Sequence, residues 1–165
     1  MMSALIASTG LMTGFVSPAV AADGKPFTIV SKQDPRYCID SPDRSPGGIL
    51  TIKFCDVVTD SKTFVFTDSP ARSGSQLHTN VFGTRPQPNL CIDGHTSASP
   101  LTLQTCDSSK TQLWRYTPTY ELRNPYDLCI DIPGGNPYPG ASLISYPCHG
   151  GSNQFWSLVV MPDPG

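Results

Sequence analysis

The stretch "LCIDIPGGNPYPGASLISYPCHGGSNQFW", residues 128–156, contains the pattern that decides the fold. It begins with Cys-Ile-Asp, runs through a loop rich in proline and glycine to a short apolar segment, and reaches a second cysteine at Cys148. Gln-Phe-Trp follows at 154–156. Cys-Ile-Asp opens two earlier stretches in the same way, at Cys38 and at Cys91. The chain therefore holds three copies of one unit, and an internal repeat has to be explained before any single residue.

All six cysteines belong to this repeat, one pair in each copy, and the paired cysteines are 17, 15 and 19 positions apart. The similarity of the copies selects one connectivity from the fifteen that six cysteines allow. The predicted disulfides are Cys38–Cys55, Cys91–Cys106 and Cys129–Cys148. Closing loops of this length stabilises a fold by roughly 3 kcal/mol for each bridge. An even number of cysteines without Cys-x-x-Cys spacing is typical of an exported disulfide framework, and it does not support a zinc ribbon or a thioredoxin-like site.

Each copy predicts about four short strands. They are expected at 27–31, 36–40, 49–54 and 62–67, then at 75–81, 88–93, 101–105 and 112–116, and finally at 119–123, 127–132, 142–146 and 154–159. One four-stranded unit cannot bury both of its faces, whereas three units around a pseudo-threefold axis close into a capped barrel with few open edges. We therefore predict an all-β fold, a β-trefoil of three four-stranded repeats at about 27–70, 71–117 and 118–160, each with one disulfide.

The composition excludes several classes of function. The length of 165 residues suits one domain, only 15% of the residues are charged, and the formal net charge is −2. Nucleic acid and anionic membrane surfaces both require clustered lysine and arginine, so neither is an expected partner. The sequence has no HExxH, no GxSxG, no phosphate-binding loop and no convincing pair of carboxylates. We expect no enzymatic activity, no cofactor and no metal.

Residues 1–22 differ from the rest of the chain. They contain no charged side chain before Asp23, they include a short apolar run, and Ala-Val-Ala at 19–21 matches a signal-peptidase cleavage pattern. We predict a secretory signal peptide, cleaved at the end of this motif or after Ala22, and a secreted, extracellular mature domain over 23–165. The lack of lysine or arginine near the start departs from the signal-peptide pattern. A membrane anchor is disfavoured because the run is short and interrupted by polar residues, so no membrane insertion is expected.

At this point the repeats resemble a known family. Three copies of Cys-Ile-Asp, a second cysteine and Gln-x-Trp at 112–114 and 154–156 resemble the ricin B-type lectin domain, a β-trefoil that binds galactose-type and other sugars. The resemblance extends from about Phe27 to Leu158, and Phe-Val-Phe at 64–66 is the degenerate counterpart of Gln-x-Trp in the first copy. A sugar site of this family requires the aspartate of Cys-Ile-Asp, an aromatic ring two residues before the second cysteine, and an asparagine before the glutamine of Gln-x-Trp.

The resemblance implies a complete site in the third copy alone. The aspartate would accept hydrogen bonds from sugar hydroxyls, and the tyrosine would stack on an apolar sugar face. Each side chain also has an ordinary explanation, as a turn residue, a strand aromatic or a surface histidine, but their shared phase favours the site. The glutamine is expected mainly to support backbone groups, because its counterpart is present where the site is not. The predicted sugar-binding residues are Asp131, Ile144, Tyr146, His149, Asn153 and Gln154.

The first and second copies lack parts of this site. In the second copy Asp93 is retained, but Gln104 stands where the ring should be and Thr111 stands where the asparagine should be. In the first copy Asp40 is retained, Lys53 occupies the ring position and there is no Asn-Gln pair. Both copies are therefore expected to be vestigial sites.

Other aromatic and histidine residues are not assigned to the site. Trp114 and Trp156 recur with the fold and are expected to fill its core. His78 and His95 have no apparent companions in the sequence and are expected to play no special part. Tyr138, in the loop that follows the third Cys-Ile-Asp, is a further candidate for lining the site.

Three functions are compatible with these observations. The first is a secreted lectin that binds galactose- or N-acetylgalactosamine-type glycans or glycoproteins. The second is a β-trefoil used for protein contact, either a toxin delivery subunit or a protease inhibitor of the Kunitz type, although such inhibitors lack the repeated Cys-Ile-Asp and Gln-x-Trp. The third is a carbohydrate-binding module of a glycosidase. A leader at one end and "MPDPG" soon after the last predicted strand favour a free-standing lectin, and the sequence identifies no toxin or enzyme partner chain.

Overall fold

The computed structural model describes residues 24–67, 74–79 and 89–162. The signal peptide predicted for residues 1–22 lies outside the described residues. Within the described ranges the chain forms thirteen β-strands and four short 3-10 helices and no α-helix. No helix in these ranges has the length and apolar character needed to cross a membrane.

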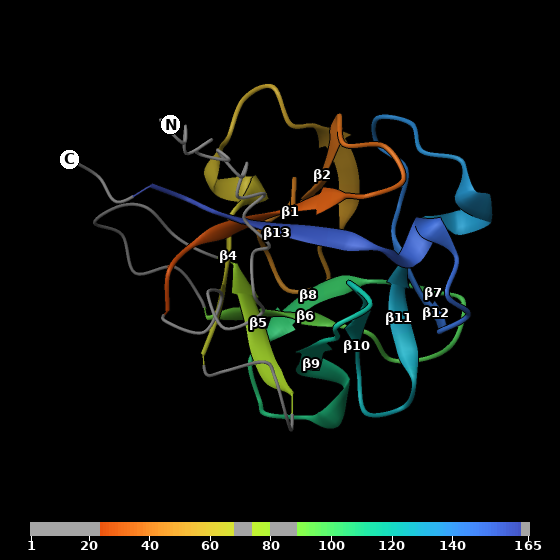
Figure 1. Cartoon of the computed structure of the whole chain (residues 1–165). Coiled ribbons are helices and arrows are strands. Elements are labelled where there is room, and N and C mark those ends of the chain that lie inside the picture. Colours follow the sequence, from red (N-terminus) through yellow and green to blue (C-terminus); the bar gives the residue numbers. More distant parts are fainter. Residues whose placement is uncertain (1–23, 68–73, 80–88, 163–165) are drawn as a thin grey trace, which may run out of the picture.

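Six of the strands form a closed barrel (Figure 1). Strand β1 pairs with β4 and β13, β5 pairs with β4 and β9, and β9 pairs with β10. A bridge between Glu121 and Phe155 closes the ring between β10 and β13. Every barrel strand thus has two neighbours, which removes the open edges that a sheet would otherwise expose. The six strands are β1 (Phe27–Ser31), β4 (Phe64–Phe66), β5 (Ser75–Thr79), β9 (Leu113–Tyr116), β10 (Leu122–Arg123) and β13 (Trp156–Val160).

Three antiparallel hairpins complete the fold. They are β2 (Tyr37–Asp40) with β3 (Thr51–Phe54), β6 (Leu90–Asp93) with β8 (Thr102–Thr105), and β11 (Leu128–Asp131) with β12 (Ile144–Pro147). The first strand of each hairpin pairs with the barrel strand that precedes it, and the short β7 (Ser99–Pro100) pairs with β12. The repetition makes the molecule a β-trefoil, as predicted. We name its parts the first lobe (β1–β4), the second lobe (β5–β9) and the third lobe (β10–β13).

The twelve predicted strands are all present, and most are shorter than expected. Residues 62, 112 and 154 were placed at strand starts, but each is the last residue of a 3-10 helix: η2 (Asp60–Lys62), η3 (Lys110–Gln112) and η5 (Ser152–Gln154). The fourth, η4 (Pro133–Gly135), follows the third Cys-Ile-Asp. The two-residue β7 was not predicted, because so short a segment carries no alternating pattern.

The predicted disulfide pairing is confirmed. The bridges are Cys38–Cys55, Cys91–Cys106 and Cys129–Cys148, with Cα–Cα distances of 5.1–5.2 Å. Each bridge joins the first strand of a hairpin to the residue that directly follows its second strand. The disulfides therefore hold the two strands of every hairpin together at the same end.

The two tryptophans fill the core, as predicted. Trp114 and Trp156 are fully buried, and each indole Nε1–H donates to the carbonyl of the isoleucine in the Cys-Ile-Asp of its own lobe. The distances are 2.9 Å to Ile92 and 3.0 Å to Ile130. A buried Trp N–H normally finds such an acceptor, so each indole fixes its hairpin against the barrel.

The predicted position of the degenerate Gln-x-Trp motif in the first lobe is wrong. The structural counterpart is Lys62-Thr63-Phe64, two residues earlier than the predicted Phe-Val-Phe, because Lys62 ends η2 as Gln112 ends η3 and Gln154 ends η5. Lys62 Nζ donates to the carbonyl of the residue before the second cysteine at 2.7 Å, and both glutamine Nε2 atoms donate to the matching carbonyls at 3.0 Å. A buried lysine thus replaces the glutamine of the other lobes.

Replacing Lys62 with alanine should lower the free energy of unfolding by about 1–3 kcal/mol, because it removes a donor from two carbonyls at a largely buried position. Those carbonyls belong to Phe54 and Val57. Lys62→Gln should lose less, since its amide can donate to one of them. Urea unfolding measures both variants, with the exposed Lys110→Ala in η3 as the control. Equal stability of Lys62→Ala and the control would contradict this role.

Candidate functional site

A cleft of about 420 Å³ opens in the third lobe. Five of the six residues predicted for the sugar site line it, and the sixth, Gln154, is fully buried behind it. Pro133, Gly134 and Gly135 form a wall that was not predicted, because they contribute backbone and ring rather than polar side chains. The available sequence indication was their position directly after the third Cys-Ile-Asp. The lining residues are Asp131, Pro133, Gly134, Gly135, Ile144, Tyr146, His149 and Asn153.

Asp131 ends β11 with its carboxylate almost buried, at 2% exposure. Its Oδ2 accepts hydrogen bonds from Gln154 Nε2 at 2.8 Å and from Asn153 Nδ2 at 2.9 Å. His149 Nε2 lies 3.4 Å from the same oxygen. The other oxygen, Oδ1, receives no hydrogen bond from the described part of the chain. One oxygen of Asp131 is therefore held by the protein, and the other remains available at the cleft.

The orientations of Asn153 and His149 follow from their backbone partners. Asn153 Nδ2 also donates to the carbonyl of Ile132 at 3.1 Å, which places its Oδ1 away from Asp131. His149 Nδ1 accepts the Gly151 N–H at 3.1 Å, so the neutral ring carries its proton on Nε2, the nitrogen that faces Asp131. A Cβ at Gly151 would lie 2.5 Å from His149 Cε1 and 2.6 Å from Asn153 Oδ1. Glycine at this position therefore lets both side chains take up these places.

Tyr146 supplies an exposed aromatic ring at the cleft. It lies two residues after Ile144 on β12, so the two side chains point to the same face of the strand. The ring is 40% exposed and meets the imidazole of His149 edge-to-face, with centroids 6.0 Å apart and an interplanar angle of 77°. The imidazole packs against the tyrosine ring and orients it, and the ring still lines the cleft.

Gln154 positions the site without lining it. Besides Asp131, its Nε2 donates to the carbonyl of Pro147 at 3.0 Å, and its Oε1 accepts the His149 N–H at 2.9 Å. The side chain thus joins the end of β11, the end of β12 and the loop that carries His149. Because it is fully buried, we assign Gln154 to holding Asp131 rather than to direct contact with a ligand.

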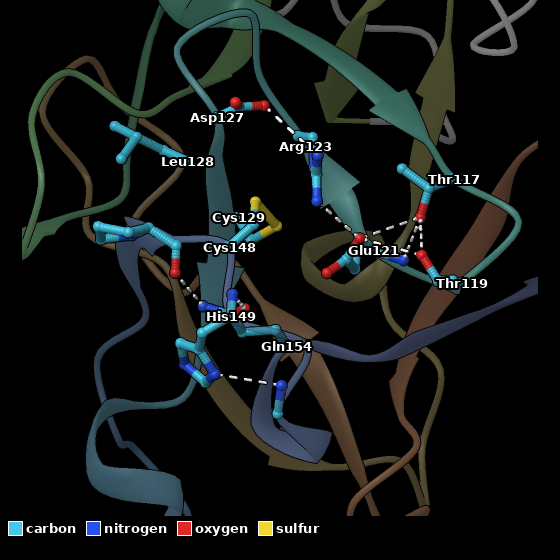
Figure 2. A network of polar contacts seen from close by, with 12 residues as sticks. Thr117, Thr119, Glu121, Arg123, Asp127, Leu128, Cys129, Cys148, His149 and Gln154 are labelled. Atoms are coloured by element: carbon cyan, nitrogen blue, oxygen red, sulfur yellow. Dashed lines mark hydrogen bonds and ion pairs between the residues drawn. A yellow bond between two sulfur atoms is a disulfide. The ribbon is translucent and has the colours of Figure 1, made fainter.

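A second polar group lies on the other side of the Cys129–Cys148 disulfide (Figure 2). The buried carboxylate of Glu121 accepts hydrogen bonds from Thr119 Oγ1 at 3.0 Å and from Arg123 Nη2 at 3.2 Å. None of these three residues lines the third-lobe cleft. The group therefore satisfies a buried charge behind the site and takes no part in it.

Burial raises the pKa of Asp131 above the ordinary value of 3.8. Hydrogen bonds from Gln154, His149 and Asn153 favour the ionised form and oppose this rise. Removal of the carboxylate from water is the larger effect, so Asp131 takes up a proton at a higher pH than an exposed aspartate does. In its ionised form the residue acts only as an acceptor.

The equivalent carboxylate of the first lobe is occupied by the protein itself. Ser61 Oγ donates to Asp40 Oδ1 at 2.6 Å, and Lys53 Nζ lies 3.4 Å from Oδ2. Ser61 occupies the place of Asn153, and Lys53 occupies the place of Tyr146. Ser61 thus holds one oxygen of Asp40, and the other is a buried atom that accepts no hydrogen bond from the described residues but lies at ion-pair distance from Lys53.

The second lobe reaches the same result with a different side chain. Gln112 Nε2 donates to Asp93 Oδ2 at 3.2 Å, and His95 Nε2 lies 3.3 Å from Oδ1. The prediction that His95 has no companion is therefore wrong, and so is the prediction for His78, whose Nδ1 lies 2.6 Å from Asn89 Oδ1. The sequence did indicate the first of these pairs, because His95 follows Asp93 by only two residues.

Two other candidate features contribute nothing to the site. Tyr138 is exposed but is not among the residues that line the third-lobe cleft. Two groups of possible metal ligands occur in the described ranges, and each contains a cysteine pair: Cys91 with Cys106, and Cys129 with Cys148. Both pairs are disulfides, and metals bind the thiolate form of cysteine, so neither group is suited to a metal.

Comparison with known families gives one match. The model of the ricin-type beta-trefoil lectin domain matches residues 78–161, slightly more than half of the chain. The matched range includes the third-lobe cleft and begins within β5. A search among curated protein sequences gives no match.

Several solved structures share the fold. The designed threefold-symmetric protein ThreeFoil has a TM-score of 0.72 and 18% identity, over 84% of this chain and 100% of its own. The earthworm R-type lectin C-half, solved in complex with GalNAc, has a TM-score of 0.66 and 16% identity, over 83% and 99% of the two chains. A non-toxic homologue of type II RIPs from Momordica charantia (bitter gourd), solved with alpha-methyl-D-galactoside, has a TM-score of 0.63 and 19% identity, over 81% and 47%. At these identities the likeness shows the β-trefoil fold.

Replacing Asp131 with asparagine should raise stability relative to the wild type at pH 7, and this gain should shrink as the pH falls. A folded-state pKa that is raised by burial means that ionisation costs stability, and this cost appears as the pH rises through that pKa. Urea unfolding between pH 3 and pH 7 measures the difference. The control is Asp107→Asn, because hydrogen bonds from Ser109 lower the pKa of Asp107 and reverse the expected sign. A gain for Asp131→Asn that grows on acidification would contradict the burial effect.

Proposed function

Because the chain belongs to the ricin-type beta-trefoil lectin family, we propose that it is a carbohydrate-binding lectin and that its sugar site is the third-lobe cleft. One observation carries the choice of this lobe. Of the three buried Cys-Ile-Asp carboxylates, only that of Asp131 has an oxygen that neither accepts a hydrogen bond from the described residues nor lies at ion-pair distance from one of their basic side chains, and it lies beside an exposed tyrosine. Asp40 Oδ2 and Asp93 Oδ1 accept no hydrogen bond from this part of the chain either, but both atoms are buried, and Lys53 Nζ lies 3.4 Å from the first and His95 Nε2 lies 3.3 Å from the second.

The cleft offers the groups that a saccharide requires. A sugar presents several hydroxyls and an apolar C–H face, and a site for it combines acceptors, donors and an aromatic ring on a rigid frame. Asp131 Oδ1 and Asn153 Oδ1 accept sugar hydroxyls, and His149 Nε2–H is a donor at the rim. The ring of Tyr146 packs against the C–H face, with Ile144 beside it. The bonds of Asn153 and Gln154 to the other carboxylate oxygen keep this arrangement fixed before a ligand arrives.

Galactose-type sugars are the proposed ligands. The spacing of Ile144, Tyr146, His149 and Asn153 resembles that of a galactose- and N-acetylgalactosamine-binding repeat of the ricin family, which supports this choice. The GalNAc and galactoside in the earthworm and bitter gourd proteins also support it. A single shallow site binds a monosaccharide with a Kd of roughly 0.1–1 mM, or about −4 to −5.5 kcal/mol. Glycoproteins with clustered glycans, or association of several copies of the chain, would then supply useful avidity.

The proposed location is extracellular. All three disulfides are of the structural kind that persists in an oxidising environment. A cleaved leader over residues 1–22 and a mature domain over 23–165 complete this proposal.

Titration of the protein with galactose, N-acetylgalactosamine and glucose, followed by NMR, tests the function. Galactose-type sugars should shift amide signals of the third lobe saturably. Asp131→Asn keeps an oxygen for Gln154 and Asn153 but replaces the free acceptor with an amide NH₂, and Tyr146→Ala removes the ring. Each should raise the Kd at least about tenfold, or about 1.4 kcal/mol.

The matched control is Asp93→Asn, the same change at the same place in the second lobe, where His95 already faces the carboxylate. This variant should bind like the wild type. If no sugar binds, or if Asp131→Asn and Tyr146→Ala bind as tightly as the wild type, the third-lobe cleft is not a sugar site and protein partners become the better hypothesis.

A further inference from the structure

Gln33 connects the first lobe to the third-lobe cleft. It lies in the loop between β1 and β2, and its Nε2 donates to the carbonyl of Gly135 at 2.7 Å, across 102 positions of sequence. Gly135 lines the cleft as part of the wall that it forms with Pro133 and Gly134. A side chain from one lobe thus makes a short hydrogen bond to the binding wall of another.

The turn that forms this wall is short and contains two glycines. The turn Pro133–Gly135 is a single 3-10 turn, with Gly134 and Gly135 both at a positive φ of 64°. Its remaining backbone bonds are local: Gly135 N–H to Ile132 at 3.0 Å and Asn136 N–H to Pro133 at 3.5 Å. Two successive glycines leave the backbone free to take other conformations. Ile132, directly before the turn, is joined to Asn153 by two hydrogen bonds, and Gln33 supplies the hydrogen bond that the turn residues themselves receive from a distant part of the described chain.

A related contact joins the third lobe to the second. Asn124, in the loop between β10 and β11, donates from Nδ2 to the carbonyl of Gly94 at 3.2 Å, and Gly94 directly follows Asp93 in the second lobe. In both cases a loop amide of the next lobe around the barrel bonds to the turn after Cys-Ile-Asp. The barrel is closed, so the lobe that follows the third is the first, and the donor for the third-lobe turn is Gln33.

The two donors differ in what else they do. Asn124 is buried and its Oδ1 accepts the N–H groups of Tyr126 and Leu128, so it also shapes its own loop. The Oε1 of Gln33 is buried and receives no hydrogen bond from the described residues. The hydrogen bond to Gly135 is therefore the main polar contact of the Gln33 side chain, and its effect is concentrated on the cleft wall.

We infer that Gln33 is a positioning residue for the sugar cleft. By fixing the Gly135 carbonyl, it sets how far the Gly134–Gly135 backbone lies from Asp131 and Tyr146, and hence the width available to a sugar ring. This inference rests on the proposed sugar-binding function. It adds a determinant of affinity that lies outside the third lobe, in a lobe whose own carboxylate is occupied.

Three substitutions at one position test the inference. Gln33→Met keeps the length but removes the donor, Gln33→Glu sets a carboxylate against the Gly135 carbonyl, and Gln33→Lys retains a donor. Galactose titrations should give a five- to tenfold higher Kd for the methionine and glutamate variants, which is about 1–1.4 kcal/mol. The lysine variant should bind close to the wild type. The midpoint of thermal unfolding should not change, because Gln33 and Gly135 are only half-buried.

A second readout requires no ligand. In the free Gln33→Met protein the amide signals of Gly134 and Gly135 should broaden or exchange faster with solvent. The control is Gln76→Met, the same substitution at a half-buried glutamine of the second lobe that bonds to Gln112. If the wild type binds sugar and Gln33→Met binds equally well, the inference is overturned while the proposed function stands. If the wild type binds none of the sugars, both are overturned.

Discussion

A buried carboxylate at the end of each Cys-Ile-Asp strand is the constraint on which the rest of the structure depends. Asp40, Asp93 and Asp131 are each 2% exposed, and an ionised group removed from water needs hydrogen bonds or an opposite charge. In the second and third lobes the residue that ends the 3-10 helix before the core tryptophan meets this need. Its amide also reaches the carbonyl before the second cysteine, so the bond that satisfies the carboxylate also fastens the hairpin to the barrel.

The three lobes meet this constraint in different ways, and this difference is the basis for proposing the third-lobe cleft as the sugar site. Lys53 Nζ and His95 Nε2 lie 3.4 Å and 3.3 Å from the carboxylates of the first and second lobes, and Lys53 stands at the position that Tyr146 has in the third lobe. A sugar hydroxyl would have to displace a lysine or histidine that is already in place, and a neutral hydroxyl is a weaker partner for a carboxylate than an ammonium ion. In the third lobe, Asn153 and Gln154 both bind the same oxygen and leave the other one free. The three lobes share a backbone arrangement, and the surroundings of this carboxylate differ between them through a few side chains.

The features of the fold that recur in all three copies could be predicted from the sequence. Cys-Ile-Asp and the second cysteine recur in phase, so the strands, the disulfides and the buried tryptophans could be predicted, together with most of the side chains around the cleft. What the sequence did not predict depends on contacts that no repeat reveals. Lys62 takes the place of a glutamine although its side chain is chemically different and it stands one position further from the second cysteine of its lobe. The wall of the cleft is formed largely by the backbone of two glycines, which no side-chain pattern reveals. The contact between His95 and Asp93 occurs in the second copy alone, so the repeat does not reveal it. Gln33 lies 102 positions from Gly135, the glycine to which it donates a hydrogen bond.

Closure of the barrel makes the lobes depend on one another in a way that their separate motifs do not suggest. The last strand pairs with the first along five residues, so the chain ends of the trefoil are joined as firmly as any two neighbouring strands. The loop that leaves the first strand is thereby placed against the turn after the third Cys-Ile-Asp, where Gln33 bonds to Gly135. Under the inference drawn for Gln33, the first lobe contributes to the cleft of its neighbour although its own carboxylate faces Lys53. The proposed site then consists of the third lobe together with the loop of the lobe that follows it around the closed barrel.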